Sequence, residues 1–277
     1  MRVPTLLPRF CLVAVASILL AWVGTATAVI QVYTCGQACA ADCELANDLI
    51  CGGTYGYGVK LLAGADLDLK GHTITCDGCD PGWSIGVLVD SASSASVIKN
   101  PLYRNFGQIL GPWYAGVHCQ QAAGSRVTGI YIDGAMDTTG ISDCRKVDAN
   151  VVVNCGVGIY NGSIHSSDYI RDNLIKGGVT GIAVVGSGAA DIDHNVIVRT
   201  SIFGIEAGNA TSTSLAITGN VFFQGLGEGG LIRPTNLING SRNHILSGNV
   251  CDDSVSSCVS CINAGKCTKY EAPFVGP

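Results

Sequence analysis

The sequence has little charge, few aromatic residues and only two methionines. Charged residues make up 13% of its 277 residues, about half of the roughly 25% that soluble domains usually carry. No long run of like charges is present, and 47% of the residues are apolar. That apolar content supplies ample core, so a disordered chain is excluded.

Glycine and cysteine are the residues in excess. The chain has 37 glycines, nearly twice the usual share of roughly 7%, and 14 cysteines. A glycine inside a helix costs about 1 kcal/mol relative to alanine. This glycine content therefore disfavours long amphipathic helices, and a turn-rich β architecture remains.

The first 28 residues have the pattern of a secretory signal peptide. Arg2 and Arg9 precede an apolar run over residues 11–23, and Ala26-Thr27-Ala28 is a small-x-small cleavage pattern. The alternative is a signal anchor, but the run has 13 residues, short of the roughly 20 that span a bilayer. No later stretch is long and apolar enough to cross a membrane. We expect cleavage after Ala28 and a chain that is secreted, periplasmic or on the cell surface, without a membrane span.

The net charge of the remaining chain argues against nucleic acid as a partner. Removal of residues 1–28 takes away two arginines and no acidic residue, which leaves a net charge of −7. A surface with that excess of negative charge repels phosphate backbones.

Thirteen cysteines remain after cleavage, gathered mainly near the two ends. In an exported protein such clusters are first read as disulfides, whereas the spacing of Cys76–Cys79 and of Cys258–Cys261 leaves zinc binding as an alternative. Because thirteen is odd, at least one thiol is free or bonded to another chain. The positions are Cys35, Cys39, Cys43, Cys51, Cys76, Cys79, Cys119, Cys144, Cys155, Cys251, Cys258, Cys261 and Cys267.

A repeat of 22 to 29 residues runs through the middle of the chain. Its first marker is an apolar residue, two others, an asparagine and another apolar residue; the asparagines are Asn150, Asn173, Asn195, Asn220 and Asn249. Its second marker is a glycine followed by an aliphatic residue, at Gly86, Gly116, Gly140, Gly158, Gly181, Gly204 and Gly230. Two markers with one period indicate stacked rungs of a parallel β-solenoid.

In such a solenoid, equivalent residues of successive rungs stack about 4.8 Å apart. The repeated asparagines are then expected to form a ladder of side-chain amides, although each could instead be a single turn residue. The apolar residues three positions earlier predict a continuous interior stack of Val147, Ile170, Ile192, Ile217 and Leu246.

Residues 67–74, Leu-Asp-Leu-Lys-Gly-His-Thr-Ile, are similar to a phrase in the first rung of many right-handed β-helix proteins. With the repeats, the chain resembles the superfamily that includes pectate lyases, polygalacturonases and alginate epimerases. The resemblance covers about residues 59–250 and implies an all-β, right-handed parallel β-helix of roughly seven to nine rungs. We expect His72, within that phrase, to be a turn residue.

The open ends of a solenoid need caps. We expect residues 29–58 to form an N-terminal cysteine-rich cap with a helix over residues 38–50, where Cys39 and Cys43 lie one turn apart. Residues 251–277 are expected to form an irregular C-terminal cap held by disulfides. The stretch 103–114 lengthens one repeat and is expected to bulge out as a loop.

The densest charged patch that the repeat predicts precedes the asparagines. Two positions before them lie Asp148, Arg171 and Asp193, and one position before them lie Asp172 and His194. In a lyase-like or epimerase-like reaction, Arg171, Asp193 and His194 would be the catalytic residues, with Arg171 or His194 removing a proton. Asp148 and Asp172 would bind the ligand, with Ca²⁺ as the candidate ion. The alternative is a surface ladder of alternating charges, worth about 0–1 kcal/mol per pair and without chemistry.

The other outward positions carry weaker signals. His118, Tyr160 and Glu206 lie two residues after their marker glycines, and Asp143 lies three after, nominally inward. Each one alone is more often a solvated or turn residue than a catalyst. Three more polar residues lie near turns, namely His165, Lys176 and Arg199.

The chain departs from the signatures of the related enzymes. The ordered polygalacturonase motifs are missing, and Asp80-Pro81 is followed by Gly82 where the epimerase signature has histidine. Two functions therefore stay open. One is an exported protein that binds or processes an extracellular or cell-wall polysaccharide, and the other is a noncatalytic secreted solenoid that acts as a surface or binding scaffold.

Overall fold

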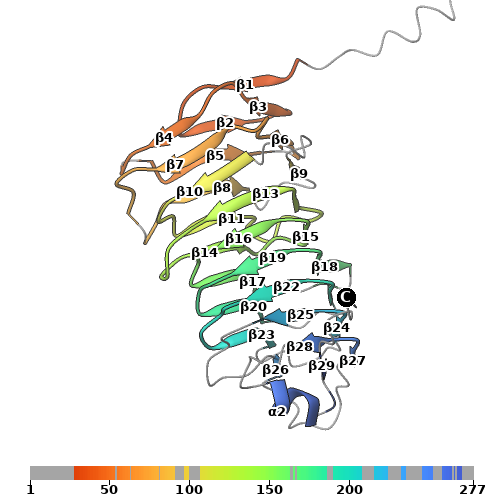
Figure 1. Ribbon diagram of the computed structural model, residues 1–277. Helices are drawn as coiled ribbons and strands as arrows, with labels where there is room; N and C mark the ends of the chain where they lie inside the picture. Colours follow the sequence, from red (N-terminus) through yellow and green to blue (C-terminus); the bar gives the residue numbers. More distant parts are fainter. Residues whose placement is uncertain are drawn as a thin grey trace, which may run out of the picture.

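The protein is a column of stacked rungs built from three parallel β-sheets, as the computed structural model shows (Figure 1). The structure describes residues 28–53, 55–62, 64–80, 82–90, 97–99, 107–162, 165, 167–185, 190–207, 215–223, 232–234, 245–251, 258–263, 265 and 267–269. The chain winds from sheet to sheet, so neighbours in one sheet come from successive rungs. The predicted right-handed β-helix is confirmed. The predicted signal peptide, residues 1–28, lies outside the described residues except for Ala28.

Each sheet consists of short strands with parallel neighbours. Sheet A has ten strands: β1 (Ile30–Val32), β3 (Cys43–Leu45), β6 (Leu67–Asp68), β9 (Val97–Lys99), β12 (Arg126–Thr128), β15 (Lys146–Asp148), β18 (Asp168–Arg171), β21 (Ala190–Asp193), β24 (Ala216–Thr218) and β27 (Ile245–Ser247). Sheet B has nine: β2 (Gln37–Cys39), β5 (Tyr57–Leu61), β8 (Ile85–Val89), β11 (Ala115–His118), β14 (Thr139–Ser142), β17 (Val157–Asn161), β20 (Thr180–Val184), β23 (Phe203–Ala207) and β26 (Ile232–Pro234). Sheet C has ten: β4 (Leu49–Cys51), β7 (Thr73–Cys76), β10 (Gly107–Leu110), β13 (Ile130–Asp133), β16 (Val151–Val153), β19 (Leu174–Lys176), β22 (Val196–Val198), β25 (Val221–Phe223), β28 (Val250–Cys251) and β29 (Thr268–Lys269).

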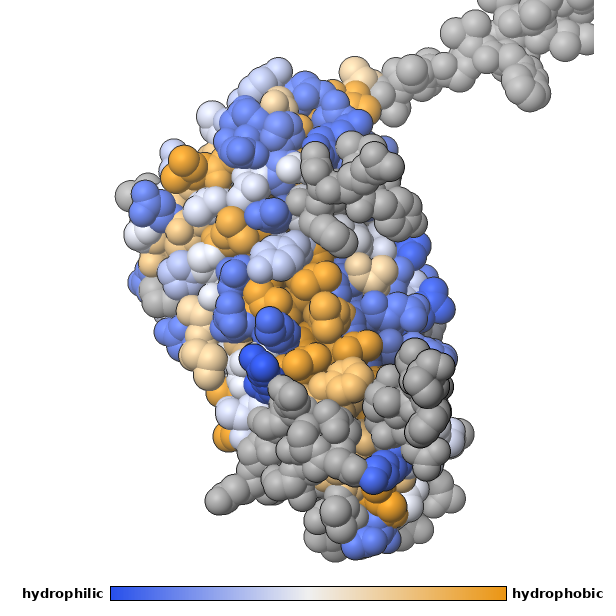
Figure 2. Space-filling view, viewed as in Figure 1, coloured by the Kyte–Doolittle hydropathy of each residue, from blue (hydrophilic) through white to orange (hydrophobic). Residues whose placement is uncertain are grey.

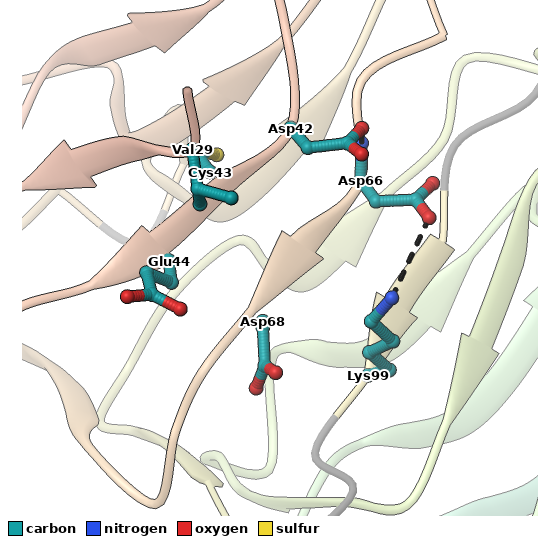
Figure 3. A pocket seen from close by; sticks show the side chains of 7 residues that line it. All are labelled: Val29, Asp42, Cys43, Glu44, Asp66, Asp68 and Lys99. Atoms are coloured by element: carbon teal, nitrogen blue, oxygen red, sulfur yellow. Dashed lines mark hydrogen bonds and ion pairs between the residues drawn. The ribbon is translucent and has the colours of Figure 1, made fainter. Parts of the chain in front are cut away.

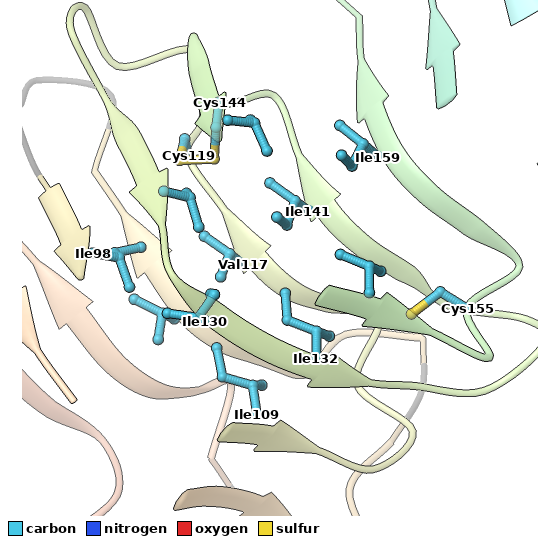
Figure 4. Packing of buried hydrophobic residues seen from close by; sticks show 14 of the residues in the cluster. Ile98, Ile109, Val117, Cys119, Ile130, Ile132, Ile141, Cys144, Cys155 and Ile159 are labelled. Atoms are coloured by element: carbon cyan, nitrogen blue, oxygen red, sulfur yellow. A yellow bond between two sulfur atoms is a disulfide. The ribbon is translucent and has the colours of Figure 1, made fainter. Parts of the chain in front are cut away.

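The core is a set of aliphatic columns that run the length of the solenoid. In sheet A, Val147 pairs with Ile170, which pairs with Ile192, and all three are buried. Sheets B and C add their own buried columns, and the interior is mainly aliphatic, with cysteines and the aromatic residues Trp113 and Phe222 among its members (Figure 4). Like residues therefore stack on like, and hydrophobic burial is shared evenly among the rungs.

The five repeated asparagines form a buried ladder between sheets A and C. Asn150 Nδ2 donates to Asn173 Oδ1 at 3.0 Å, and Asn173 Nδ2 donates to Asn195 Oδ1 at 2.9 Å. The same contact continues to Asn220 and Asn249, at 3.0 Å in each case. Each amide group also binds main-chain carbonyls, so the polar groups of this corner are satisfied away from water.

The residue before each ladder asparagine adopts a left-handed backbone conformation. Its φ is 56° at Ala149, 56° at Asp172, 55° at His194, 64° at Gly219 and 66° at Gly248. This conformation turns the chain from sheet A into sheet C. Asp172 and His194 thus occupy a position where glycine also fits, which gives them a role in the turn whatever their chemistry.

The marker glycines lie where sheet B approaches the core most closely. A Cβ atom on Gly181 would lie 2.5 Å from the Gly204 carbonyl oxygen and 2.9 Å from Ile197 Cγ2. The glycine of the second repeat marker is therefore needed because a side chain at this position would clash with the neighbouring rung.

The predicted helix over residues 38–50 is wrong. The segment contains three strands, β2, β3 and β4, which pair with the rungs below them, and no helical cap occurs among the described residues of this end. Cys39 and Cys43 form a disulfide across the turn between two strands. Their spacing, which suggested one face of a helix, reflects this short turn.

The predicted bulge over residues 103–114 is wrong in its second half. Residues 107–110 form β10 inside sheet C, between β7 and β13. Trp113 is 1% exposed, and its Nε1 donates to the Leu110 carbonyl at 3.0 Å. Residues 103–106 lie outside the described residues.

At the C-terminal end, a short helix, α2 (Cys258–Asn263), precedes the last strand of sheet C. The remainder of the expected cap, residues 252–257, 264, 266 and 270–277, lies outside the described residues. None of the described helices is long and apolar enough to cross a membrane.

The cysteines form disulfides, which confirms that interpretation over zinc binding. The five described pairs are Cys35–Cys51, Cys39–Cys43, Cys76–Cys79, Cys119–Cys144 and Cys251–Cys258. Cys155 is free and buried. Five disulfides indicate an oxidising, extracytoplasmic compartment.

Candidate functional site

The charged residues predicted before the ladder lie on the outer face of sheet A. Asp148 pairs with Arg171, which pairs with Asp193 in the next rung. Asp148 is nevertheless 7% exposed, because Arg126 covers it with two hydrogen bonds of 2.8 and 2.7 Å. Thr128 Oγ1 adds a third at 3.1 Å. Both oxygens of Asp148 are therefore already engaged within the chain.

The other predicted residues of this face form two separate contacts. The Arg171 guanidinium lies 4.2 Å from the centre of the Tyr169 ring. His194 Nδ1 lies 2.8 Å from Asp193 Oδ2, at an exposed position. Asp172 is exposed at the turn. The rung register brings the predicted residues onto one face, and their roles in catalysis and ligand binding remain predictions.

A second polar group, whose members have weaker signals in the sequence, lies on the outer face of sheet B. His118, Ser142 and Tyr160 occupy equivalent positions in three successive rungs. Asp143 follows Ser142 and leaves the regular strand conformation, with φ of 56°. We call His118, Ser142, Asp143 and Tyr160 the sheet B cluster.

Asp143 is the centre of the sheet B cluster. Its Oδ1 accepts a hydrogen bond from the Gly162 amide at 2.8 Å, and its Oδ2 accepts one from Ser142 Oγ at 2.9 Å. His118 Nδ1 lies 3.7 Å from Asp143 Oδ2, and none of the described residues forms a hydrogen bond with this buried nitrogen. The carboxylate is thus held rigidly beside the imidazole.

Burial sets the protonation of the histidine. Desolvation lowers the pKa of His118 below its ordinary value of 6.5, and the negative charge of Asp143 raises it by a smaller amount. His118 is therefore neutral at pH 7. Its side chain keeps 21% of its surface exposed although Nδ1 is buried. A neutral, partly exposed imidazole has a lone pair that can accept a proton.

Tyr160 lies on the other side of Asp143. A Cβ atom on Gly162 would be 3.0 Å from Tyr160 Oη and 3.1 Å from Asp143 Oδ1, so both oxygens pack closely against this glycine. Burial, Asp143 and Tyr114 together raise the pKa of the Tyr160 hydroxyl. The phenol therefore keeps its proton at neutral pH.

The backbone around the sheet B cluster is strained and cross-linked. Three residues other than glycine at this corner have positive φ: Gln120 at 42°, Gln121 at 61° and Asp143 at 56°. The Cys119–Cys144 disulfide joins the residues that follow His118 and Asp143 (Figure 4). Strained conformations held by surrounding structure are frequent at functional sites.

A third feature is an acidic pocket near the N-terminal end of sheet A. Asp42, Glu44, Asp66 and Asp68 line it, with Lys99 at its edge (Figure 3). Lys99 Nζ lies 3.7 Å from Asp66 Oδ2, and Asp42 Oδ1 accepts a hydrogen bond from the Asp66 amide at 3.1 Å. Across the described residues, no three His, Cys, Asp or Glu side chains are grouped closely enough to hold a metal ion.

Comparison with known proteins gives the family. The sequence profile described as "Right handed beta helix region" matches residues 23–197, more than half of the chain. The chain belongs to this family. No curated protein and no solved structure matches this β-helix protein.

The sheet B cluster has only weak signals in the sequence because its members are far apart. His118, Asp143 and Tyr160 come from three rungs, and only the correct register brings them together. Asp143 follows an interior-facing pattern in sequence, whereas its left-handed backbone turns it toward His118. The signal that could have identified the sheet B cluster is the set of polar residues that lie two and three positions after the marker glycines.

Proposed function

We propose that this β-helix protein is exported and binds an extracellular polysaccharide across the outer face of sheet B, where His118 and Tyr160 act as base and acid. The observation that carries the proposal is the neutral His118 held against Asp143 beside a protonated Tyr160. A row of outward side chains in successive rungs suits an extended polymer, because the polymer and the solenoid are both repetitive along one axis.

A uronate-containing chain fits this acid–base pair. His118 would take the proton at C5 as the C4–O bond breaks, and Tyr160 would give its proton to the leaving glycosidic oxygen. The products are an unsaturated uronate with a C4–C5 double bond and a second fragment with a new reducing end. Proton transfer through solvent from His118 to the tyrosinate would then restore both groups.

The test is incubation of the mature protein with polygalacturonate and with alginate, each with and without Ca²⁺. Ultraviolet absorbance reports unsaturated uronates, and a separate assay reports reducing ends. We expect His118→Gln and Tyr160→Phe to abolish turnover but to retain binding. If wild type yields no product from either polymer, the catalytic proposal is wrong.

The same assay tests the face predicted from the sequence. Arg171→Ala and Asp193→Ala are the matched variants on sheet A, outside the sheet B cluster. If they abolish turnover while His118→Gln does not, the reaction belongs to the Arg171, Asp193 and His194 face, with Asp148 and Asp172 as its ligand-binding residues. We expect the opposite result.

The second candidate function is a noncatalytic scaffold. Its support is the contact between Asp148 and Arg126, which satisfies both carboxylate oxygens within the chain, as expected of a structural charge ladder. Binding on a glycan array without turnover of any bound glycan would favour this function.

A further inference from the structure

The outer face of sheet C carries an apolar strip. The register aligns two outward columns along the solenoid. The first column is Tyr131, Val151, Leu174, Val196, Val221 and Val250; the second is Leu110, Asp133, Val153, Lys176, Val198 and Phe223. Figure 2 shows the apolar surface that gathers over the sheet C strands facing the viewer in Figure 1.

Two charged residues interrupt the second column symmetrically. Asp133 lies one rung before Val153, and Lys176 lies one rung after it. Asn154 Nδ2 donates to Asp133 Oδ1 at 2.9 Å and holds the carboxylate in place. Lys176 is exposed between Val153 and Val198, and the described residues offer it no ion pair.

We propose that two copies of the chain pack through the outer faces of sheet C, about a two-fold axis that runs along β16. Such an axis lies in the interface and reverses the order of the rungs. Asp133 of each copy then faces Lys176 of the other, and Val151 faces its own equivalent. The strands of the two copies stay aligned, as in face-to-face packing of sheets.

The position of this axis also gives the largest overlap. β16 is the fifth of the ten strands of sheet C, so almost the whole sheet is covered. At about 4.8 Å per rung and about 3.3 Å per residue, the facing strip is about 40 Å long and about 10 Å wide. Roughly 400 Å² per copy is half of a standard interface, so the dimer is weak and depends on concentration.

Cysteine cross-linking tests the position of the axis. In Val151→Cys the new thiol lies on the axis and faces its equivalent, whereas in Val221→Cys the two thiols lie about 30 Å apart, since β25 faces β7. The native free thiol, Cys155, is buried and serves as the wild-type control. With diamide as oxidant, we expect covalent dimers of Val151→Cys only.

Charge reversal tests the ion pairs by an independent measurement. Sedimentation velocity over a concentration series is expected to show a reversible wild-type dimer that is lost in Lys176→Asp and regained in Lys176→Asp with Asp133→Lys. Circular dichroism and the melting temperature check that each variant is folded. A wild type that stays monomeric throughout, equal cross-linking of both cysteine variants, or a folded double variant that stays monomeric would overturn the proposal.

Discussion

Asn173 Nδ2 donates to Asn195 Oδ1 at 2.9 Å, across the boundary between two rungs that are 22 residues apart in the chain. The Asn173 main-chain amide donates to the same oxygen at 3.1 Å. The side-chain oxygen of Asn195 thus accepts hydrogen bonds from two donors of Asn173, in the rung above. The side-chain NH₂ group of Asn195 donates to the rung below. The corner between sheets A and C is held together by these contacts, in a place that water does not reach.

Asn195→Ala is expected to destabilise the protein by about 3 kcal/mol or more. The change removes the partner of two Asn173 donors and of the Ile170 carbonyl, and each buried group left unsatisfied costs about 1–3 kcal/mol. Urea unfolding followed by circular dichroism measures the change. Asn47→Ala, at an exposed asparagine that binds only the neighbouring Asp48 carbonyl, is the control and should stay within about 0.5 kcal/mol of wild type.

Loss of the Cys119–Cys144 disulfide is expected to cost more than loss of the Cys39–Cys43 disulfide. The first closes a loop of 25 residues and the second a loop of 4, which corresponds to about 3.5 and about 2 kcal/mol in the chain-entropy account. Paired Cys→Ala variants compared by urea unfolding give both values. Equal costs would contradict the dependence on loop length that this account predicts.

Cys155 is expected to resist alkylation in the folded protein. Its thiol is buried, and burial raises its pKa to about 12, so almost no thiolate exists at pH 8. Iodoacetamide labelling with mass spectrometry of the peptide that contains Cys155 should show modification only after denaturation. Rapid labelling of the native protein would mean that this corner opens frequently.

His118 is expected to make the protein less stable as the pH falls. Its folded-state pKa lies below the ordinary 6.5, so the unfolded chain binds more protons in the interval between the two values. The part of the unfolding free energy that depends on a neutral His118 is fully present above about pH 6.5. It is lost as the pH drops toward the folded-state pKa of His118. Unfolding free energies at pH 7, 6 and 5 should therefore fall more steeply for wild type than for His118→Gln.

Asp143→Asn provides a direct check on the cause of this shift. Asp143 raises the pKa of His118 against the larger effect of burial. Its neutralisation should lower the midpoint of the His118 titration further, as measured by nuclear magnetic resonance.

The repeat identified the fold because its markers record physical constraints that act in every rung. The asparagines mark one buried corner, and the glycines mark the closest approach of backbone to core, as at Gly181. Both constraints act on single residues at fixed positions, so they are visible in one sequence.

The N-terminal strands could not be predicted from the sequence, because no constraint on single residues at fixed positions marks them. Strands of three residues, such as β2 and β3, are too short for an alternating pattern to emerge. The spacing of Cys39 and Cys43 fits both a helical turn and a tight connection between strands. Only pairing with the rung below decides between them, and that pairing joins residues far apart in sequence.

The charged column on sheet A could be predicted from the sequence, whereas the sheet B cluster could not. The column of Asp148, Arg171 and Asp193 was found because it keeps a constant distance from the ladder asparagines. The burial of Asp148 beneath Arg126 depends on side-chain geometry. So does the approach of His118 to Asp143, which a linear pattern does not contain.

The asparagine ladder makes each rung an interchangeable repeating unit of the molecule. Asn150 meets Asn173 through the same atoms that Asn173 offers to Asn195, so the groups presented at each boundary are interchangeable. Excision of one complete rung, from Leu174 to Asn195, would place Val196 after Asn173 and leave matching surfaces to close. The solenoid can therefore become shorter or longer by whole rungs while its cross-section stays the same.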